Sequence, residues 1–163
     1  MKIKKHTFNI LFLGLLLLFV GRVEAQQTPV EKRVYQTHHV NPHPPEIDGK
    51  TTDPVWDGVE WSGDFTQTQP NSGSTPFQQT TFKVVYDDKN LYVLIRAYDT
   101  EPDKITKRVT RRDNFDSDWV GINIDSYFDK RTAFSFTLSA AGSRSDAAIS
   151  NDNDWDTSWD PVW

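Results

Sequence analysis

The sequence predicts an all-β protein, an antiparallel β-sandwich of jelly-roll type, and three features of the 163-residue chain support this prediction. Residues 81–99 contain two β-rich runs around a four-residue polar turn, which is the pattern of an antiparallel hairpin. Residues 118–138 repeat this pattern around a second polar turn. The rest of the chain is rich in turn residues and has little helical signal, so we expect short strands in two stacked layers.

The first 25 residues are typical of a cleavable signal peptide. Three lysines within the first five residues precede an apolar stretch over residues 8–20, and we expect cleavage after Ala25. This stretch is shorter than the roughly 20 apolar residues of a transmembrane helix. We therefore expect an exported protein of the bacterial periplasm, outer membrane or extracellular space.

The exported chain is acidic and contains no cysteine. The whole sequence has 18 basic and 23 acidic residues, and loss of four basic residues and Glu24 with the signal peptide leaves 14 and 22, a net charge of −8. Such a surface repels polyanions, so nucleic acid is excluded as a partner. The lack of cysteine also excludes disulfides and thiolate metal sites, so core burial must stabilise the fold.

The segment before the hairpin contains one short helical signal. Residues 26–44 are polar and rich in proline and histidine, and we expect a linker or edge segment there, followed by a domain over residues 45–163. Asp53 can cap a short helix that has Pro54 at its first position, which places Trp56 in the core.

The stretch between this helix and the hairpin is interpreted as structural aromatic residues followed by a loop. Phe65 is interpreted as a structural residue. Residues 67–79 lack periodicity and are rich in Gly, Ser, Thr, Pro and Gln, which predicts a loop.

The hairpin is expected to lie at the centre of the domain. Alternation places Phe82, Val84 and Tyr86 on one face of its first strand. The second strand, residues 91–97, is apolar on both faces apart from Arg96, which predicts a central position in a covered sheet.

A second strand system follows. In residues 118–125, Val120, Ile122 and Ile124 share one face, and Trp119 points to the other. Residues 134–138 are expected to return as the partner strand.

The C-terminal part is expected to be incomplete as a sandwich. Residues 146–149 can begin one more strand, and the tail, residues 150–163, ends on Pro-Val-Trp without a turn. Closing both layers needs more strands than these, so we expect the fold to continue beyond Trp163.

Four ordered blocks within residues 45–142 resemble the family 9 carbohydrate-binding module. They are Pro45-Glu46-Ile47-Asp48-Gly49 with Asp53 and Trp56, then Val85-Tyr86-Asp87-Asp88 to Asn90-Leu91-Tyr92-Val93, then Asp116-Ser117-Asp118, and then Val120-Gly121-Ile122-Asn123-Ile124-Asp125. The resemblance implies a β-sandwich that binds a polysaccharide or oligosaccharide, with structural calcium ions. Some members hold the reducing end of a glycan between two tryptophans, and the resemblance places Phe115 at one of these stacking positions.

A fifth block is similar to a different group of sequences. Residues 125–129 and 131–134 resemble the N-terminal region of large bacterial outer-membrane proteins, in which such a module precedes a C-terminal domain expected to be a barrel. The resemblance implies that this chain is part of a larger envelope protein involved in carbohydrate catabolism, with that domain as its partner.

The candidate sugar-binding residues surround the start of the strand at 118–125. Sugar recognition requires an aromatic plane against the C–H face of a pyranose and planar polar groups for its hydroxyls. Phe115 and Trp119 flank Asp116 and Asp118, with Arg111 nearby. Two positions are open for Trp119: an exposed sugar-binding surface, or the inner side of the other sheet layer.

Alternating carboxylates mark a candidate metal site in the tail. Asp152, Asp154 and Asp156 are separated by single residues, and hard oxygen ligands at this density suit calcium. The alternative is a solvated acidic loop, because the glycine and distal glutamate of a calcium-binding loop are absent.

Enzymatic activity has no recognisable motif in this sequence. A glycosidase needs two positioned carboxylates, and no nucleophile elbow, zinc-binding helix or phosphate loop is present. The favoured hypothesis is a non-catalytic carbohydrate-binding module. The alternatives are a structural or interaction domain of an outer-membrane barrel protein, and an accessory module of a glycoside hydrolase whose catalytic part lies elsewhere.

Overall fold

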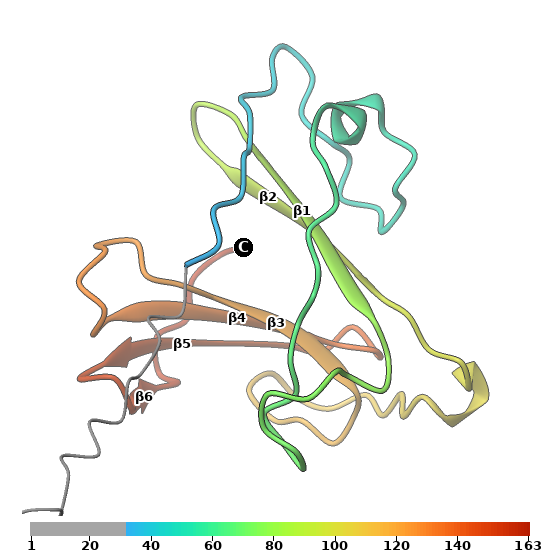
Figure 1. Ribbon diagram of the computed structural model, residues 1–163. Coiled ribbons are helices and arrows are strands. Elements are labelled where there is room, and N and C mark those ends of the chain that lie inside the picture. The colour runs from blue at the N-terminus through green and yellow to red at the C-terminus, as the bar shows by residue number, and fades with distance from the viewer. Residues whose placement is uncertain (1–31) are drawn as a thin grey trace, which may run out of the picture. The chain divides into compact units, whose positions relative to one another are not determined.

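The computed structural model describes residues 32–163, and Tyr35–Trp163 forms one compact unit. The predicted signal peptide therefore lies outside the described residues. Two antiparallel sheets make up the fold (Figure 1). The first consists of β1 (Thr80–Tyr86) and β2 (Leu91–Ala97), and the second has the order β3 (Trp119–Ile124), β4 (Ala133–Ser139), β5 (Arg144–Ser150) and β6 (Asp154–Asp156).

The described residues contain no α-helix and only two 3-10 turns. These are η1 (Pro54–Gly58) and η2 (Pro102–Lys104). None of the helices in this part of the chain has the length and apolar character needed to cross a membrane. The all-β fold class with antiparallel sheets is thereby confirmed, and it is consistent with a β-sandwich.

The β1–β2 hairpin has the predicted turn. Its register joins Tyr86 to Leu91, and Asp87 closes the turn by accepting the backbone N–H groups of Lys89 and Asn90, each at 2.7 Å, on Oδ1. The Tyr92 hydroxyl donates to Asp87 Oδ2 at 2.7 Å. The pKa of Asp87 is lowered to about 2, and the hydrogen bond from the Tyr92 hydroxyl makes the largest contribution to this shift.

The expectation that β2 lies centrally in its sheet is wrong for the described strands. β2 pairs only with β1, so it is an edge strand, and Leu91 is half-exposed. Apolar residues on both faces of a strand indicate that both faces of its sheet are covered. They do not indicate whether another strand pairs with its backbone.

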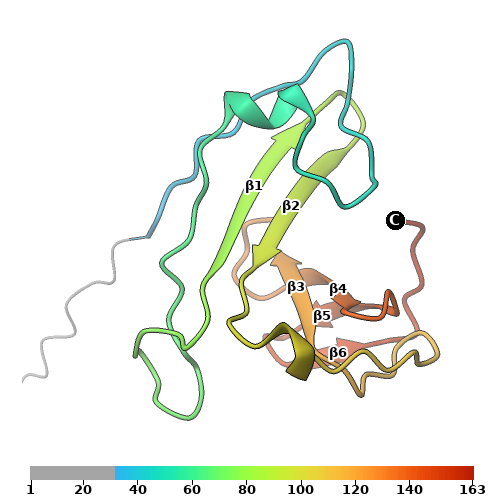
Figure 2. The same cartoon turned by 90° about the vertical axis from the view of Figure 1, so that its right-hand side faces the viewer.

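The core beside this hairpin is centred on Val85, which is fully buried. Val40, Trp56 and Val59 surround it. The segment that contains Val40 runs along β1, since the Val40 N–H donates to the Tyr86 carbonyl at 2.7 Å. Figure 2 shows η1 beside the C-terminal end of β1, and this position lets Trp56 reach the same core.

The short helical signal is confirmed with one correction. Pro54 begins η1 and Trp56 is only 4% exposed, as predicted. The Asp53 side chain does not cap the turn, however. Its Oδ2 accepts the backbone N–H of Glu46 at 3.1 Å instead, so Asp53 ties the preceding loop to η1.

The second sheet has one apolar face. The register joins Ile122 to Phe136 and Ile124 to Phe134, which places these four side chains on the same face. Trp159 packs on Phe134 and Phe136 with ring centroids 4.7 and 5.8 Å apart. The tail therefore folds back over the apolar face of the sheet.

A buried carboxylate anchors this tail. Asp146 in β5 is 1% exposed, and its Oδ2 accepts hydrogen bonds from Arg112 Nε at 3.1 Å and from Trp163 Nε1 at 3.0 Å. Arg112 Nη2 also donates to Asp146 Oδ2 at 2.5 Å, to the Pro161 carbonyl at 3.0 Å and to Asp160 Oδ1 at 2.5 Å. One guanidinium thus joins the β5 strand to the last residues of the described chain.

Candidate functional site

Two aromatic rings come together where β3 begins. Trp119 is the first residue of β3 and is 61% exposed, while Phe115 in the preceding loop is half-buried. Their ring centroids are 6.4 Å apart and their planes are inclined by 35°. The distance is within the contact range of about 4.5–7 Å for aromatic pairs, so the rings form one continuous apolar surface.

The sheet register determines the surroundings of Trp119. Trp119 pairs with Ser139 and Gly121 pairs with Thr137, so small and polar side chains share its face. Val120 and Ile122 point to the apolar face of the sheet, and Trp119 points to the opposite, exposed face.

Gly121 lies close to its neighbours on β4. A Cβ atom at Gly121 would lie 2.8 Å from Thr137 Oγ1 and 3.1 Å from the Phe136 carbonyl oxygen. The Thr137 side chain therefore occupies the position that a side chain at Gly121 would need.

The two predicted carboxylates have different partners. Asp118 Oδ2 accepts the Thr106 N–H at 2.8 Å, and the Asp118 backbone also bonds to Thr106. Asp116 forms an ion pair with Arg108, with 2.5 Å between Oδ2 and Nη1, and both side chains are exposed. The Asp118 side chain thus bonds to the backbone of its own loop, whereas the Asp116–Arg108 pair lies at the surface beside Phe115.

The loop between η2 and β3 is held by its own hydrogen bonds. The Ser117 hydroxyl donates to the Thr106 carbonyl at 2.7 Å, and it accepts the Arg108 N–H at 3.1 Å. Further along, the Thr110 N–H donates to Ser143 Oγ at 3.0 Å. These bonds fix the backbone on both sides of Phe115, so the ring is positioned before any ligand arrives.

The two adjacent arginines of this loop point in different directions. Arg111 is exposed, and among the described residues its guanidinium has no ion-pair or hydrogen-bond partner. Arg112 contacts Asp146 on the apolar side of the sheet, and this bond raises the pKa of Arg112. In the sequence both arginines lie close to Phe115. The fold gives their side chains different surroundings.

The predicted calcium ligands do not form a metal-binding group. In the described part of the chain, no three His, Asp or Glu side chains gather closely enough to hold an ion. Asp154 accepts the Asn151 amide at 3.1 Å, and Asp156 accepts the Ser158 N–H and hydroxyl at 2.9 and 2.6 Å. The Ser158 hydrogen bonds lower the pKa of Asp156. Asp152 lies in the preceding turn, and a calcium role for these three carboxylates stays a prediction.

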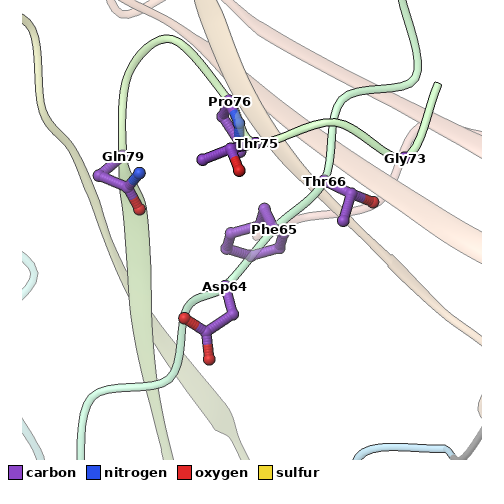
Figure 3. A pocket seen from close by; sticks show the side chains of 7 residues that line it. All are labelled: Asp64, Phe65, Thr66, Gly73, Thr75, Pro76 and Gln79. Atoms are coloured by element: carbon purple, nitrogen blue, oxygen red, sulfur yellow. The ribbon is translucent and has the colours of Figure 1, made fainter. Parts of the chain in front are cut away.

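A pocket lies in a part of the chain where the sequence predicts only a loop. Its volume is about 260 Å³, and it is lined by residues of the segment 64–79 (Figure 3). Phe65, which is interpreted from the sequence as structural, is 45% exposed and contributes its ring to the wall. The only sequence signal for this pocket is the density of Thr, Gln and Pro between two aromatic residues, Phe65 and Phe77.

Comparison with known proteins gives one result. A protein-family model described as "carbohydrate family 9 binding domain-like" matches residues 47–159. No curated protein and no solved structure matches. The matched region includes the Phe115–Trp119 pair and both sheets, and it spans more than half of the sequence. The chain belongs to the carbohydrate family 9 binding domain-like family.

Proposed function

We propose that this domain binds neutral polysaccharide or oligosaccharide without catalysing its cleavage, through the surface formed by Phe115 and Trp119. The observation that carries the proposal is the exposed Trp119 ring in contact with Phe115 at 6.4 Å, on the polar face of β3. A sugar ring that covers this exposed aromatic surface removes apolar area from water, which favours binding.

The geometry favours stacking on one side of a sugar ring. Two rings in contact at an inclination of 35° leave no slot between them for a pyranose. A glycan would instead lie across the combined surface, with its C–H groups on the rings. This arrangement suits sugars within a chain, and differs from a grip on a glycan end between two separate tryptophans.

Polar groups for sugar hydroxyls are present at the rim. The Asp116–Arg108 pair provides both acceptors and donors next to Phe115, and Arg111 provides further donors. The predicted mature chain has a net charge of −8, which disfavours uronic-acid polymers and other polyanionic glycans. Neutral glycans are therefore the ligand class.

The state of the carboxylates supports a binding role over hydrolysis. A glycosidase requires two carboxyl groups facing each other across the scissile bond. Here Asp118 is bonded to a backbone amide and Asp116 to Arg108, and both are exposed to solvent. These partners suit a role of Asp116 and Asp118 in holding the loop and its rim, and they do not match a pair of catalytic carboxylates.

The cellular setting of the proposal comes from the sequence. The signal-peptide pattern supports export to the periplasm, outer membrane or exterior of a bacterium. In that setting the domain would deliver a glycan to a larger envelope protein, with an outer-membrane barrel as the proposed partner domain. A purely structural domain on such a protein is the alternative, and it predicts no glycan binding.

Affinity electrophoresis in native gels that contain xylan, hydroxyethyl cellulose or galactomannan tests the proposal. We expect retardation of the purified protein by at least one polymer, and loss of this retardation in Trp119→Ala. Trp155→Ala is the matched control, because Trp155 is similarly exposed, at 55%, and lies at the opposite edge of the same sheet. Equal mobility of all variants on every polymer would favour the structural alternative.

A further inference from the structure

We propose that the loop 64–79 carries a second, separate site, which takes a single neutral pyranose ring. The site is the pocket in Figure 3, between Phe65, Pro76, Asp64 and Gln79. The inference rests on the proposed carbohydrate-binding function for its ligand class, and it uses none of the residues around Trp119.

The size of the pocket suits one sugar ring. Pockets for drug-sized ligands have volumes of about 300–1,000 Å³. The volume here, about 260 Å³, lies just below that range. A disaccharide would extend beyond it, so the pocket fits a chain end or a single side-branch sugar.

The lining combines an apolar wall with a polar rim. The Phe65 ring and the Pro76 ring provide the apolar part, and Figure 3 shows the Phe65 ring between Asp64 and Pro76. The Asp64 carboxylate, the Gln79 amide and the hydroxyls of Thr66 and Thr75 provide acceptors and donors. Such a mixture matches a pyranose, which has C–H patches and hydroxyl groups on one small ring.

Other ligand classes fit this lining less well. No Lys or Arg is among the lining residues and one carboxylate is, which disfavours phosphate and other anions. A single carboxylate without two more ligands disfavours a metal ion, and no such group of three occurs in the described chain. Four polar side chains at the rim disfavour a purely apolar ligand, because their desolvation would be uncompensated.

The loop that forms the pocket is closed by hydrogen bonds. The Gln67 N–H donates to the Ser74 carbonyl at 2.8 Å, and the Gly73 N–H donates to the Gln67 carbonyl at 2.9 Å. The Gln67 amide also donates to the Thr75 carbonyl at 2.9 Å. A loop closed in this way presents Thr75 and Pro76 in fixed positions, so little conformational entropy is lost when a ligand binds.

The two ends of the pocket are attached to the β1–β2 sheet. Phe65 packs against Phe82 with ring centroids 5.9 Å apart, and Ser62 exchanges both backbone hydrogen bonds with Phe82 at 2.8 and 2.9 Å. The Gln79 carbonyl accepts the Tyr98 N–H at 2.8 Å, which extends the ladder beyond Thr80. The Phe65 ring and the backbone of Gln79 are thereby both attached to the same hairpin.

Asp64 has a backbone conformation that few residue types accept. Its φ of 55° lies in the left-handed region, where Asp and Asn are enriched over other residues with a side chain. This allows an isosteric test, because Asn keeps the backbone conformation and the shape while removing the charge.

The test uses ligand-observed saturation-transfer NMR with two probes, methyl β-D-xylopyranoside and methyl β-D-glucopyranoside. We expect binding of at least one probe to the unmodified protein. Asp64→Asn and Gln79→Ala should each weaken it about tenfold, which corresponds to the loss of one hydrogen bond to a charged or polar group. Phe65→Ala should abolish it.

Phe77→Ala is the matched control. Phe77 belongs to the same loop, is 81% exposed and does not line the pocket, so its removal should leave binding unchanged. Because Phe65→Ala also loses a contact with Phe82, near-ultraviolet circular dichroism checks its fold. If that variant is misfolded, the Gln79→Ala result decides.

The outcomes separate this inference from the proposed function. Probe binding that is lost in Trp119→Ala but kept in Asp64→Asn and Phe65→Ala overturns the second site and leaves the first. Binding that is lost in the pocket variants and kept in Trp119→Ala supports the second site alone. Equal weakening by Phe77→Ala, or no binding of either probe to the unmodified protein, overturns the inference.

Discussion

The guanidinium of Arg112 donates two hydrogen bonds to Oδ2 of Asp146, a carboxylate that is 1% exposed and lies 34 positions further along the chain. Trp163 Nε1 donates to the same oxygen, whereas Asp146 Oδ1 is buried without a hydrogen-bond partner. All the side-chain hydrogen bonds that offset the burial of this carboxylate are therefore made to one oxygen, Oδ2. The pair connects the site loop, the β5 strand and the tail.

Removal of the Asp146 carboxylate should strongly destabilise the domain. Asp146→Ala leaves the Trp163 N–H without its acceptor and leaves Arg112 only the Pro161 carbonyl and Asp160, and we expect a loss of about 3 kcal/mol in the free energy of unfolding. Urea denaturation followed by tryptophan fluorescence measures it. Asp116→Ala is the control, because it breaks an exposed ion pair and should cost no more than about 1 kcal/mol. Equal losses in the two variants would contradict the role given to Asp146.

The hairpin turn should show an acid-dependent contribution to stability. Asp87 has an ordinary pKa of 3.8 when unfolded and about 2 when folded, so the folded state binds the proton more weakly. The stabilisation is then fully present above pH 4 and is lost as the pH falls through 2. An NMR titration of the Asp87 carboxyl should give an apparent pKa of about 2.

Tyr92 offers a direct check on the cause. Its hydroxyl makes the largest contribution to the lowered pKa of Asp87, so Tyr92→Phe should move that pKa up toward 3.8. The Lys89 and Asn90 N–H groups still donate to the carboxylate, which keeps part of the shift. An unchanged pKa in Tyr92→Phe would show that the turn amides alone lower it.

The core around Val85 should depend on Trp56. Trp56→Ala creates a cavity in a site that is 4% exposed, and we expect a loss of about 3–5 kcal/mol in unfolding free energy. Trp56→Phe should cost much less, because the Trp56 Nε1–H is buried without an acceptor and its removal breaks no hydrogen bond. Chemical denaturation of both variants measures the difference, and a similar cost for the two would refute this account of Nε1.

We expect that a larger residue at position 121 destabilises the domain, because β4 lies close to Gly121. Gly121→Ala places a methyl group 2.8 Å from Thr137 Oγ1, and such overpacking costs about 1–3 kcal/mol. The double variant Gly121→Ala/Thr137→Ala should recover part of this loss. A double-mutant cycle in urea yields the coupling energy, and strict additivity of the two changes would count against the contact.

Local patterns were sufficient for the first three strands of this domain. Alternation of side chains placed β1, β2 and β3 close to their observed bounds, and Pro54 with Trp56 marked the short turn η1. These features depend on neighbours within a few residues, which is the range over which periodicity and turn residues act. The contacts of the candidate site are of the same kind, because Phe115 and Trp119 are four residues apart.

Longer-range features were outside the reach of such patterns. The tail contains no sustained alternation, yet Trp159 covers Phe134 and Phe136, and β6 forms against β5. The edge position of β2 was also missed, because the side-chain pattern indicates how well the faces of a strand are covered and not which strands pair with its backbone. Each of these features is set by segments that meet only after the chain has folded.

The sequence by itself determined an all-β domain and its family, because each depends on residue type at short spacing. Only the tertiary structure decided that Arg112 serves Asp146 while Arg111 stays at the surface, and that Phe65 faces a pocket. Adjacent residues on an irregular loop have no fixed relative direction until packing selects one. Burial of a charge such as Asp146 then selects the partner that can neutralise it, wherever that partner lies in the sequence.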